Sequence, residues 1–513
     1  MLLATILGSS MAFIDGTVVN VALPVLQREL NATAADLQWV VESYALLLAA
    51  LILVGGSLGD RLGRARVYAA GVALFTAASL ACGLAPSVGV LIVARAVQGI
   101  GGALLVPGSL AIISATFSGD GRGRAIGTWS AYTTVTAALG PVLGGWLVQT
   151  VSWRAAFFIN IPIAAVVLAM VATRVPESRD ETATGHLDLL GAVLATVGLG
   201  GLVYGLIRWG SSSLSDPVVW GSLIGGAVAL ALFALAEARE QAPMMPLSLF
   251  RSRTFSGTNL LTLLLYGALG GALYYLPFNL QQVQGYSATA AGASLLPFTV
   301  IMFLLSRWTG GLVTRVGARP PLTVGPLIAA AGFLLFTVPG VGGSYWTTYF
   351  PAVVVLGLGM AITVAPLTTA VMGAVEQSHA GVASGVNNAV SRAAGLLAIA
   401  ILGIAVSTTF ANSLESHLTG PSLSPATHRA ISAQRDRLAG VQAPVGSSPQ
   451  VARAVHAVVR NAFVDSFRLA MRLGALLAAL SALSAFLLIP GKPPAAGAGA
   501  GDPAPPRLGP GRG

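Results

Sequence analysis

Two charged residues interrupt apolar runs of this sequence, and their types and surroundings suggest proton chemistry. If these runs are membrane helices, inserting the Asp15 carboxylate near a helix centre costs about 2.5–3.5 kcal/mol of free energy. Asp15 must therefore face the protein interior or a water-filled cavity. Burial disfavours the charged carboxyl form, which allows such a group to bind and release a proton. Arg95 stays charged and needs a partner, and Gln98 and Gly102 share its helix face. We expect Asp15 and Arg95 to form a proton-coupling pair; the alternative is a permanent structural ion pair.

The composition indicates that these runs lie in a membrane. Of 513 residues, 55% are hydrophobic and only 9% are charged, and the mean hydropathy is +0.79. A water-soluble fold cannot bury so much apolar sequence and cover its surface with so few charges. The net charge of +10 does not indicate nucleic-acid binding, because the arginines are scattered through short loops. The lone cysteine, Cys82, excludes an intrachain disulfide and offers no metal-ligand cluster.

The apolar runs predict an all-α polytopic membrane protein with 14 transmembrane helices. A helix that crosses the hydrocarbon core needs roughly 20 apolar residues. Before the last span, apolar residues between Val451 and Ala462 recur at helical spacing. This segment forms either an amphipathic helix on the outer membrane surface or a helical stem of the last span. The candidate spans are 2–26, 37–57, 67–84, 89–114, 125–149, 155–172, 189–209, 218–235, 255–280, 288–313, 322–338, 346–375, 382–409 and 467–489.

Arginine placement predicts which side of the membrane each loop faces. If the loop with Asp60 is cytoplasmic, connections on that side hold twelve arginines, whereas the short opposite connections hold only Arg28, Arg154 and Arg208. In membrane proteins, short loops rich in lysine and arginine remain on the cytoplasmic side. We therefore expect both termini in the cytoplasm, a bacterial plasma-membrane location, and a long external loop over 410–461. The first span lacks a basic leader and a cleavage site, so we expect a retained helix rather than a signal peptide.

A short charged segment at 56–66 recurs in altered form at 310–319, which suggests two related halves. Asp60 aligns with Thr314, a shift of 254 residues that exceeds the length of six helices. The two spans within 189–235 account for the excess. Paired halves are a recurring transporter plan, with the substrate site between them. The predicted organisation is an N-terminal six-helix half (1–173), a cytoplasmic linker (174–188), two inserted helices (189–235), a second linker (236–254), a C-terminal six-helix half (255–489) and a disordered cytoplasmic tail (490–513).

The fifth span carries a proline with flanking glycines: Gly140, Pro141, Gly144 and Gly145. Proline removes a backbone hydrogen bond and kinks a helix, and glycines permit close helix contact. The pattern predicts a flexing seam; glycine packing alone is the alternative.

These segments resemble the motifs of the major facilitator superfamily, in particular its fourteen-helix drug/proton antiporter branch. The resemblance implies that Asp15 couples transport to protons and that Arg95 influences its protonation. It also implies that the proline-glycine seam is the motif associated with antiporters, although Thr136 stands where a further glycine is usual. The segment 153–162 closely resembles the next helix entry of the same family.

The resemblance further implies a conformational latch in the repeated loop. Asp60 would accept hydrogen bonds from the N-terminus of the family's eleventh helix, here starting near Gly381, and would hold the cytoplasmic side closed. The alternative is a charged turn that only sets topology. The predicted latch residues are Gly56, Asp60, Arg61, Gly63 and Arg64.

A set of polar side chains in the spans could line a substrate cavity with apolar walls. The same amides and hydroxyls could instead join helices by hydrogen bonds. The candidates are Asn20, Tyr44, Gln98, Gln281, Gln282, Asn387 and Asn388. Glu42 could attract cations, but we favour an interfacial acid without function, and the partners of Arg307 and Arg392 are not deducible from sequence.

Together these features predict a proton-driven antiporter that exports amphipathic small molecules such as antibiotics. The alternatives are a dedicated exporter of one metabolite or siderophore, and a non-transporting membrane receptor or assembly factor. The sequence contains no phosphate-binding loop and no hydrolase motif, so we expect neither ATP use nor an enzyme. We expect a monomer in contact with lipid, without cofactor, metal or nucleic acid, with the proton gradient as its energy source.

Overall fold

The computed structural model describes residues 1–117, 119–179, 188–212, 215–240, 243, 245–376, 380–419 and 423–491, and these are almost entirely helical. Thirteen of the described helices are long and apolar enough to cross a membrane, and the apolar helix Arg319–Leu335 is shorter. This agrees with the predicted all-α architecture of 14 transmembrane helices. The predicted tail lies outside the described residues from 492 onwards, as does part of each predicted linker.

The first group of helices and the pair that follows it are named by their bounds. They are α1 (Leu2–Glu29), α2 (Ala34–Leu62), α3 (Arg64–Gly83), α4 (Val88–Thr116), α5 (Gly119–Thr150), α6 (Ala155–Phe158), α7 (Asn160–Arg174), α8 (Leu189–Ser211) and α9 (Pro217–Arg239).

The second group contains several short or broken helices besides its long spans. It comprises η1 (Leu247–Arg251), α10 (Arg253–Tyr274), α11 (Leu276–Phe278), η2 (Asn279–Val283), α12 (Ala288–Ala293), α13 (Leu296–Thr309), α14 (Leu312–Val316), α15 (Arg319–Leu335), α16 (Tyr345–Gly373), α17 (Ala380–Leu418), α18 (Pro425–Ser432), η4 (Arg435–Gly440) and α19 (Pro449–Leu488).

Short polar signals set several helix starts. Thr33 and Asp36 form a reciprocal capping box at the start of α2, with hydrogen bonds of 3.1 and 2.9 Å. Asp216 caps α9 by accepting from the Val218 N–H at 2.9 Å, and it also accepts from Arg208 at 2.7 Å. These two interactions hold the pKa of Asp216 below its usual value.

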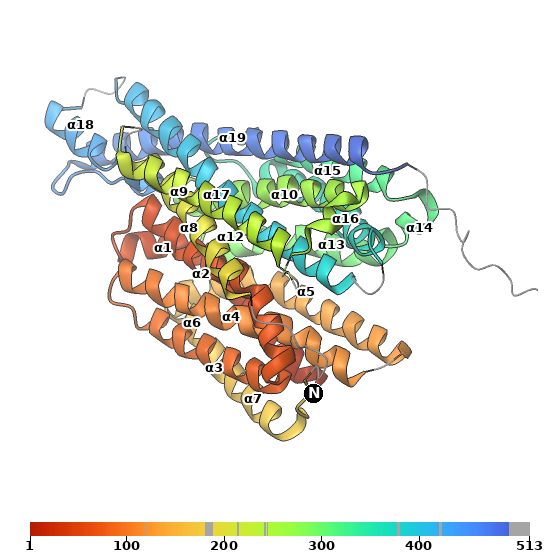
Figure 1. Ribbon diagram of the computed structural model, residues 1–513. Helices are drawn as coiled ribbons and strands as arrows, with labels where there is room; N and C mark the ends of the chain where they lie inside the picture. The colour runs from red at the N-terminus through yellow and green to blue at the C-terminus, as the bar shows by residue number, and fades with distance from the viewer. Residues whose placement is uncertain are drawn as a thin grey trace, which may run out of the picture.

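The two groups repeat the same helix pairings, which is what a duplicated chain predicts. In the first group α1 packs on α5, α2 on α4, and α3 on both α4 and α7. In the second group α10 packs on α17, α13 on α16, and α15 on both α16 and α19. Figure 1 shows the groups as two bundles, with α1–α7 in the lower part of the view and α10–α19 in the upper part.

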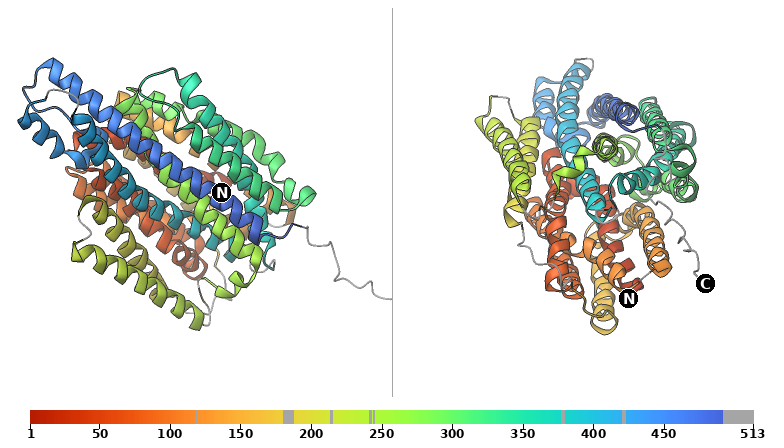
Figure 2. Two further views of the ribbon diagram at one scale, coloured as in Figure 1. Left: turned by 90° about the horizontal axis from the view of Figure 1, so that it is seen from above. Right: turned by 45° about the vertical axis from the view of Figure 1, so that its right-hand side comes forward.

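The helices α8 and α9 form a pair at the edge of the molecule, visible on the left in the right-hand view of Figure 2. Only α8 of this pair makes extensive contacts with the bundles, against α2 of one group and α17 of the other. Leu46, Val203 and Leu396 form part of the buried apolar cluster at this seam. The pair therefore packs beside the line where the two groups meet.

The segment over 410–461 differs from the predicted long loop. Helix α17 continues to Leu418 and α19 begins at Pro449, so most of the segment is helical. Four residues of the apolar stripe before the last span, Val455, Val458, Val459 and Ala462, are buried, and they belong to the same continuous helix as that span. This agrees with a stem of that span rather than a separate surface helix. These extensions are helical because their apolar stripe packs against the neighbouring helix, as Phe410 and Leu414 also show.

The two bundles are in contact at the end of the molecule where α1 ends and α2 begins, here called the α1–α2 end. Gln281 donates to the Val21 carbonyl at 2.9 Å, and Gln282 donates to Gln27 at 2.9 Å. Gln27 in turn donates to the Arg437 carbonyl at 2.8 Å. Figure 1 shows the bundles spreading apart towards the right, away from this end. The structure is therefore closed between its halves at the α1–α2 end.

Candidate functional site

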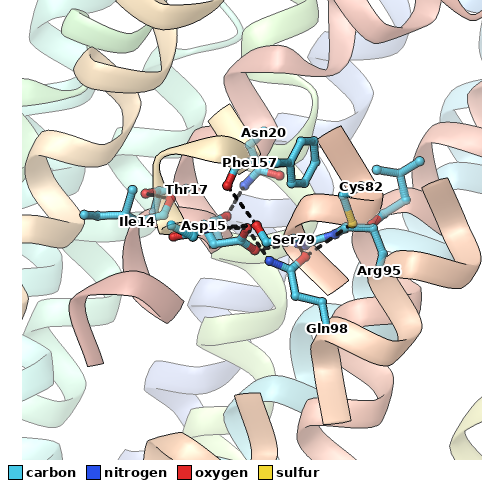
Figure 3. Close-up of polar contacts among 12 residues, drawn as sticks. Ile14, Asp15, Thr17, Asn20, Ser79, Cys82, Arg95, Gln98 and Phe157 are labelled. Atoms are coloured by element: carbon cyan, nitrogen blue, oxygen red, sulfur yellow. Dashed lines mark hydrogen bonds and ion pairs between the residues drawn. The ribbon is translucent and has the colours of Figure 1, made fainter. Parts of the chain in front are cut away.

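The buried centre of the first bundle holds the two charged residues that the sequence singles out. Asp15 of α1 is 0% exposed and Arg95 of α4 is 1% exposed. The guanidinium Nη1 of Arg95 donates to Asp15 Oδ2 and, at 2.8 Å, to Gln98 Oε1. Gln98 Nε2 donates to Asp15 Oδ1 at 2.8 Å, which closes a three-residue cluster. In Figure 3 these side chains point towards one another from two different helices.

A third helix completes the surroundings of the carboxylate. Asn160, the first residue of α7, donates to Asp15 Oδ1 at 3.4 Å and to the Ser79 hydroxyl at 2.9 Å. Ser79 of α3 donates to the Phe157 carbonyl at 2.9 Å. The cluster therefore links α1, α3, α4 and α7, and a change at Asp15 acts on all four helices.

The charge of Arg95 is also balanced by a carbonyl and by aromatic rings. Its Nε donates to the Val40 carbonyl of α2 at 3.1 Å. Its guanidinium carbon lies 4.2 Å from the ring centroid of Tyr44 and 6.0 Å from that of Phe157. Cation–π contacts of this kind are strongest when they are removed from water, as here.

The hydrogen-bond pattern fits an ionised Asp15. Both carboxylate oxygens accept hydrogen bonds, and all three partners, Arg95, Gln98 and Asn160, are donors. A protonated carboxyl would give up one of these acceptor positions. Because the pair is fully buried, a proton can reach Asp15 only when the surrounding helices rearrange. The arrangement therefore encloses a carboxylate among three donors, away from solvent in the state seen here.

The predicted seam of α5 brings helices unusually close, both within the first bundle and across to the second. A Cβ atom at Gly144 would lie 2.7 Å from Val18 Cγ1 of α1. A Cβ atom at Gly145 would clash with the carbonyl oxygen of Ala288 of α12, which belongs to the other bundle. Only glycine allows these approaches without displacing a backbone. The seam is thus a contact surface in the closed arrangement.

The substitution Gly145→Ala is expected to weaken closure at the α1–α2 end. The added methyl meets backbone atoms that cannot rotate away, and overpacking of this kind costs about 1–3 kcal/mol. The measurement is the disulfide cross-linking yield between cysteines at Gln27 and Gln282 in a Cys82→Ser background, which should fall several-fold. The control Gly225→Ala, where an added Cβ meets nothing within 4 Å, should leave the yield unchanged. An undiminished yield in Gly145→Ala would show that the seam does not control closure.

The turn between α2 and α3 has different partners from those expected for the latch. Asp60 accepts from Arg64 Nε at 2.8 Å, one helical turn further on. The N-terminus of α3 is instead bound by Glu177, which accepts from the backbone N–H groups of Ala65 and Arg66 at 3.0 and 3.2 Å. Gly63 joins the helices with a φ of +111°, a conformation that favours glycine. Among the described residues, no hydrogen bond or ion pair is found between the Asp60 side chain and α17 in this closed arrangement, although α17 begins at Ala380, near the predicted start.

The seven predicted cavity residues lie in several different surroundings in this structure. Gln98 belongs to the Asp15 cluster, and Tyr44 stacks on Arg95. Gln281 and Gln282 line a surface cavity of about 710 Å³ at the α1–α2 end. The amides of Gln98, Gln281 and Gln282 join helices by hydrogen bonds, which is the alternative to cavity lining given above.

The remaining three candidates lie elsewhere. Asn387 donates to Asn259 and Thr262 inside the second bundle at 3.1 and 2.8 Å. Asn20 donates to the Gly16 carbonyl at 3.4 Å, and Asn388 is exposed.

Sequence reasoning missed the roles of Asn160, Ser79 and Glu177. Asn160 lies in the helix-entry segment at 153–162, but an asparagine there gives no signal of which carboxylate it contacts. Glu42, expected to be an acid near the outer end of its span, lies in the third turn of α2 and is enclosed by protein, with an exposed fraction of 0%. Arg392 of α17 interacts with Tyr44 across the two bundles, and the side chain of Arg307 lies outside what the structure describes.

Sequence comparisons place the chain in a known family. A family model described as the Major Facilitator Superfamily matches residues 5–399. "Multidrug resistance protein Stp" of Mycobacterium tuberculosis is 38% identical over 81% of this chain and 77% of that protein. "Tetracenomycin C resistance and export protein" of Streptomyces glaucescens is 34% identical over 94% of this chain and 90% of that protein. "Puromycin resistance protein pur8" of Streptomyces alboniger is 35% identical over 80% of this chain and 82% of that protein.

Structural comparison agrees on the fold. A bacterial homologue of the human lysosomal transporter Spinster, in an inward-facing and unoccupied conformation, has a TM-score of 0.62 at 17% identity, covering 95% of this chain and 96% of that one. The xylose transporter XylE from E. coli, in an inward-open conformation, has a TM-score of 0.56 at 15% identity, covering 96% of each chain. With its duplicated bundles and the family match over more than half its length, this chain is a multi-pass membrane transporter of the Major Facilitator Superfamily, and not an enzyme.

Proposed function

We propose that this transporter is a proton-driven antiporter that exports amphipathic small molecules, antibiotics among them, across the cytoplasmic membrane. The observation that carries the proton coupling is the fully buried Asp15–Arg95–Gln98 cluster, because an intramembrane acid is costly unless it has a function. The substrate class is supported by the relatives, which are named for resistance to drugs or antibiotics.

The proposed cycle alternates the charge of Asp15. The α1–α2 end faces outside, and both termini face the cytoplasm, in line with the arginine-rich connections at the opposite end. Protonation of Asp15 from outside releases Arg95, drug leaves, and the α1–α2 end closes. Deprotonation towards the cytoplasm restores the ion pair seen here, and drug binds from that side. The closed arrangement with an ionised Asp15 corresponds to this cytoplasm-facing step.

The proton gradient suffices for the proposed work. One proton that enters down roughly 100 mV supplies about 2.3 kcal/mol, and one pH unit adds about 1.4 kcal/mol. At about 1.4 kcal/mol per tenfold, this supports a gradient of several hundredfold for a neutral substrate.

The proposal is tested by efflux of a compound panel from a pump-deficient bacterial host. Cells that produce the chain should retain less puromycin, tetracenomycin C or cationic dye than cells with an empty vector, and a protonophore should abolish the difference. No reduction for any compound, or a reduction that survives the protonophore, would contradict a proton-driven exporter.

A second candidate is a dedicated exporter of one compound. The observation that favours it is that relatives are named for single antibiotics, such as tetracenomycin C and puromycin. The panel distinguishes the two, since protection against one chemical class alone supports the dedicated exporter.

We also propose that Asp60 forms its latch contact with α17 in the opposite, outward-facing state, and exchanges it for Arg64 in the arrangement seen here. The substitution Asp60→Asn is then expected to shift the transporter towards the form closed at the α1–α2 end. The Gln27–Gln282 cross-linking yield should rise, whereas Thr314→Val, at the aligned position of the second copy, should change it much less. Equal effects of the two substitutions would contradict a latch specific to Asp60.

A further inference from the structure

Glu42 is a buried acid that the proposed cycle does not use. It lies in the third turn of α2, with an exposed fraction of 0%, and neither carboxylate oxygen has a hydrogen-bond partner. Its helix neighbours Val40 and Tyr44 face Arg95. Residues two positions apart on a helix differ by about 200° in direction. Glu42 therefore faces away from the Asp15 cluster.

Among the described residues, the titratable groups that interact with Glu42 belong to the other bundle. They are Tyr274 and Tyr275 at the end of α10, whose rings pack edge to face with centroids 5.0 Å apart. The Tyr274 hydroxyl is also buried without a partner. The nearby cations Arg95 and Arg392 interact with Tyr44, on the other side of α2. Among the described residues, Glu42 thus meets two neutral phenols and no cation.

A charged carboxylate in such a place is unstable. Burial of an isolated ion is far more costly than burial of a neutral acid, so the group takes up a proton instead. Glu42 is therefore a carboxylic acid whenever the bundles are packed as they are here. When the bundles separate, water reaches the group and the ionised form becomes favourable again.

A small cavity of about 10 Å³ adjoins the two tyrosines. It lies between the bundles at the α1–α2 end, and Gln27, Gln38, Tyr274, Tyr275, Ser407 and Leu438 are among its lining residues. Gln38, one turn before Glu42, donates to the Tyr275 hydroxyl and to the Ile399 carbonyl, both at 3.4 Å. Polar groups of both bundles thus lead from this end of the molecule to the tyrosines that face Glu42.

We propose that Glu42 is a second proton-binding site, loaded from the α1–α2 end, and that its protonation allows the two bundles to close at that end. A hydronium ion from that side gives its proton to the carboxylate before closure, and water takes the proton back on the same side after opening. The site therefore couples closure to the pH at the α1–α2 end without adding a proton to the transport stoichiometry. The inference rests on the proposed function only in assuming that the bundles alternate between closed and open at this end.

The test measures the separation of the bundles as a function of pH, without any substrate. Spin labels are attached at Leu84→Cys of the first bundle and Val445→Cys of the second, which are 64% and 106% exposed at this end of the molecule. Cys82 is replaced by serine, and Asp15→Asn removes the carboxyl group of the Asp15 cluster. Distances are measured by double electron–electron resonance between pH 5 and pH 9 in lipid nanodiscs. Because no drug or gradient is present, failure of drug efflux does not affect this result.

With Glu42 present, the ratio of closed to open forms should fall as pH rises, by up to tenfold per pH unit where one carboxyl titrates. Glu42→Gln, a neutral side chain of the same shape, should stay closed over the whole range. Glu42→Asp should keep a pH dependence, and the exposed control Glu240→Gln should behave like the parent. A pH-independent parent, or the same pH dependence in Glu42→Gln as in the parent, would overturn the proposal.

Discussion

Asp15→Asn is expected to abolish uphill, proton-coupled efflux while leaving the protein folded. The amide has the shape of the carboxyl group and still accepts a hydrogen bond from Arg95, but it cannot bind or release a proton. The gradient of several hundredfold that one proton supports should therefore fall to equilibration. The measurement is steady-state accumulation of a panel substrate in energised cells, with expression checked by immunoblot.

The matched control for this prediction is Asp36→Asn. Asp36 is a capping carboxylate at the start of α2, so its loss affects only a helix end. Efflux by Asp36→Asn should stay close to that of the parent. Uphill efflux that persists in Asp15→Asn would show that Asp15 does not carry the coupling proton.

Arg95→Gln is expected to cause the largest loss of stability of any single change in the site. It removes the countercharge of a fully buried carboxylate, together with the contacts to Val40 and Tyr44. Breaking a buried pair from one side costs about 3–5 kcal/mol, because the remaining charge is left without a partner. The measurement is thermal unfolding of the purified protein in detergent, and efflux should be lost as well.

A double variant separates the charge from the packing. In Asp15→Asn with Arg95→Gln the uncompensated charge is gone, so much of the lost stability should return although efflux does not. Arg208→Gln, which breaks a partly exposed pair with Asp216 at a helix end, should change the unfolding temperature little. A double variant no more stable than Arg95→Gln would mean that the arginine acts through packing rather than through its charge.

The pairing of Asp15 with Arg95 was predictable because burying either charge alone in a membrane costs free energy. Each residue supplies the opposite charge that the other needs. The contact of Asn160 with the same carboxylate was not, since its position depends on the kink between α6 and α7. The fourteen spans followed from hydropathy, but the helical course of 410–461 depends on packing between α17 and α19. Sequence placed Glu42 near the outer end of its span, but its complete burial depends on the packing of other helices around α2.

The loop between α2 and α3 shows a different limit of sequence reasoning. Its motif indicates which residues are polar and where the chain turns, but it does not indicate which residues bind Asp60 and the start of α3. In the arrangement closed at the α1–α2 end, Arg64 binds Asp60 and Glu177 binds the start of α3. A sequence motif does not show which residues it contacts in each conformational state.

The central claim is exchange of a drug against protons through Asp15, and countertransport in proteoliposomes tests it most directly. Vesicles that contain the purified protein are loaded with puromycin and a pH-sensitive dye, and are then diluted into drug-free buffer at equal pH. Drug that leaves should drive protons inwards, so the interior should acidify with the intact chain and stay unchanged with Asp15→Asn. Drug exit from the intact chain without acidification, or equal acidification with Asp15→Asn, would contradict the account.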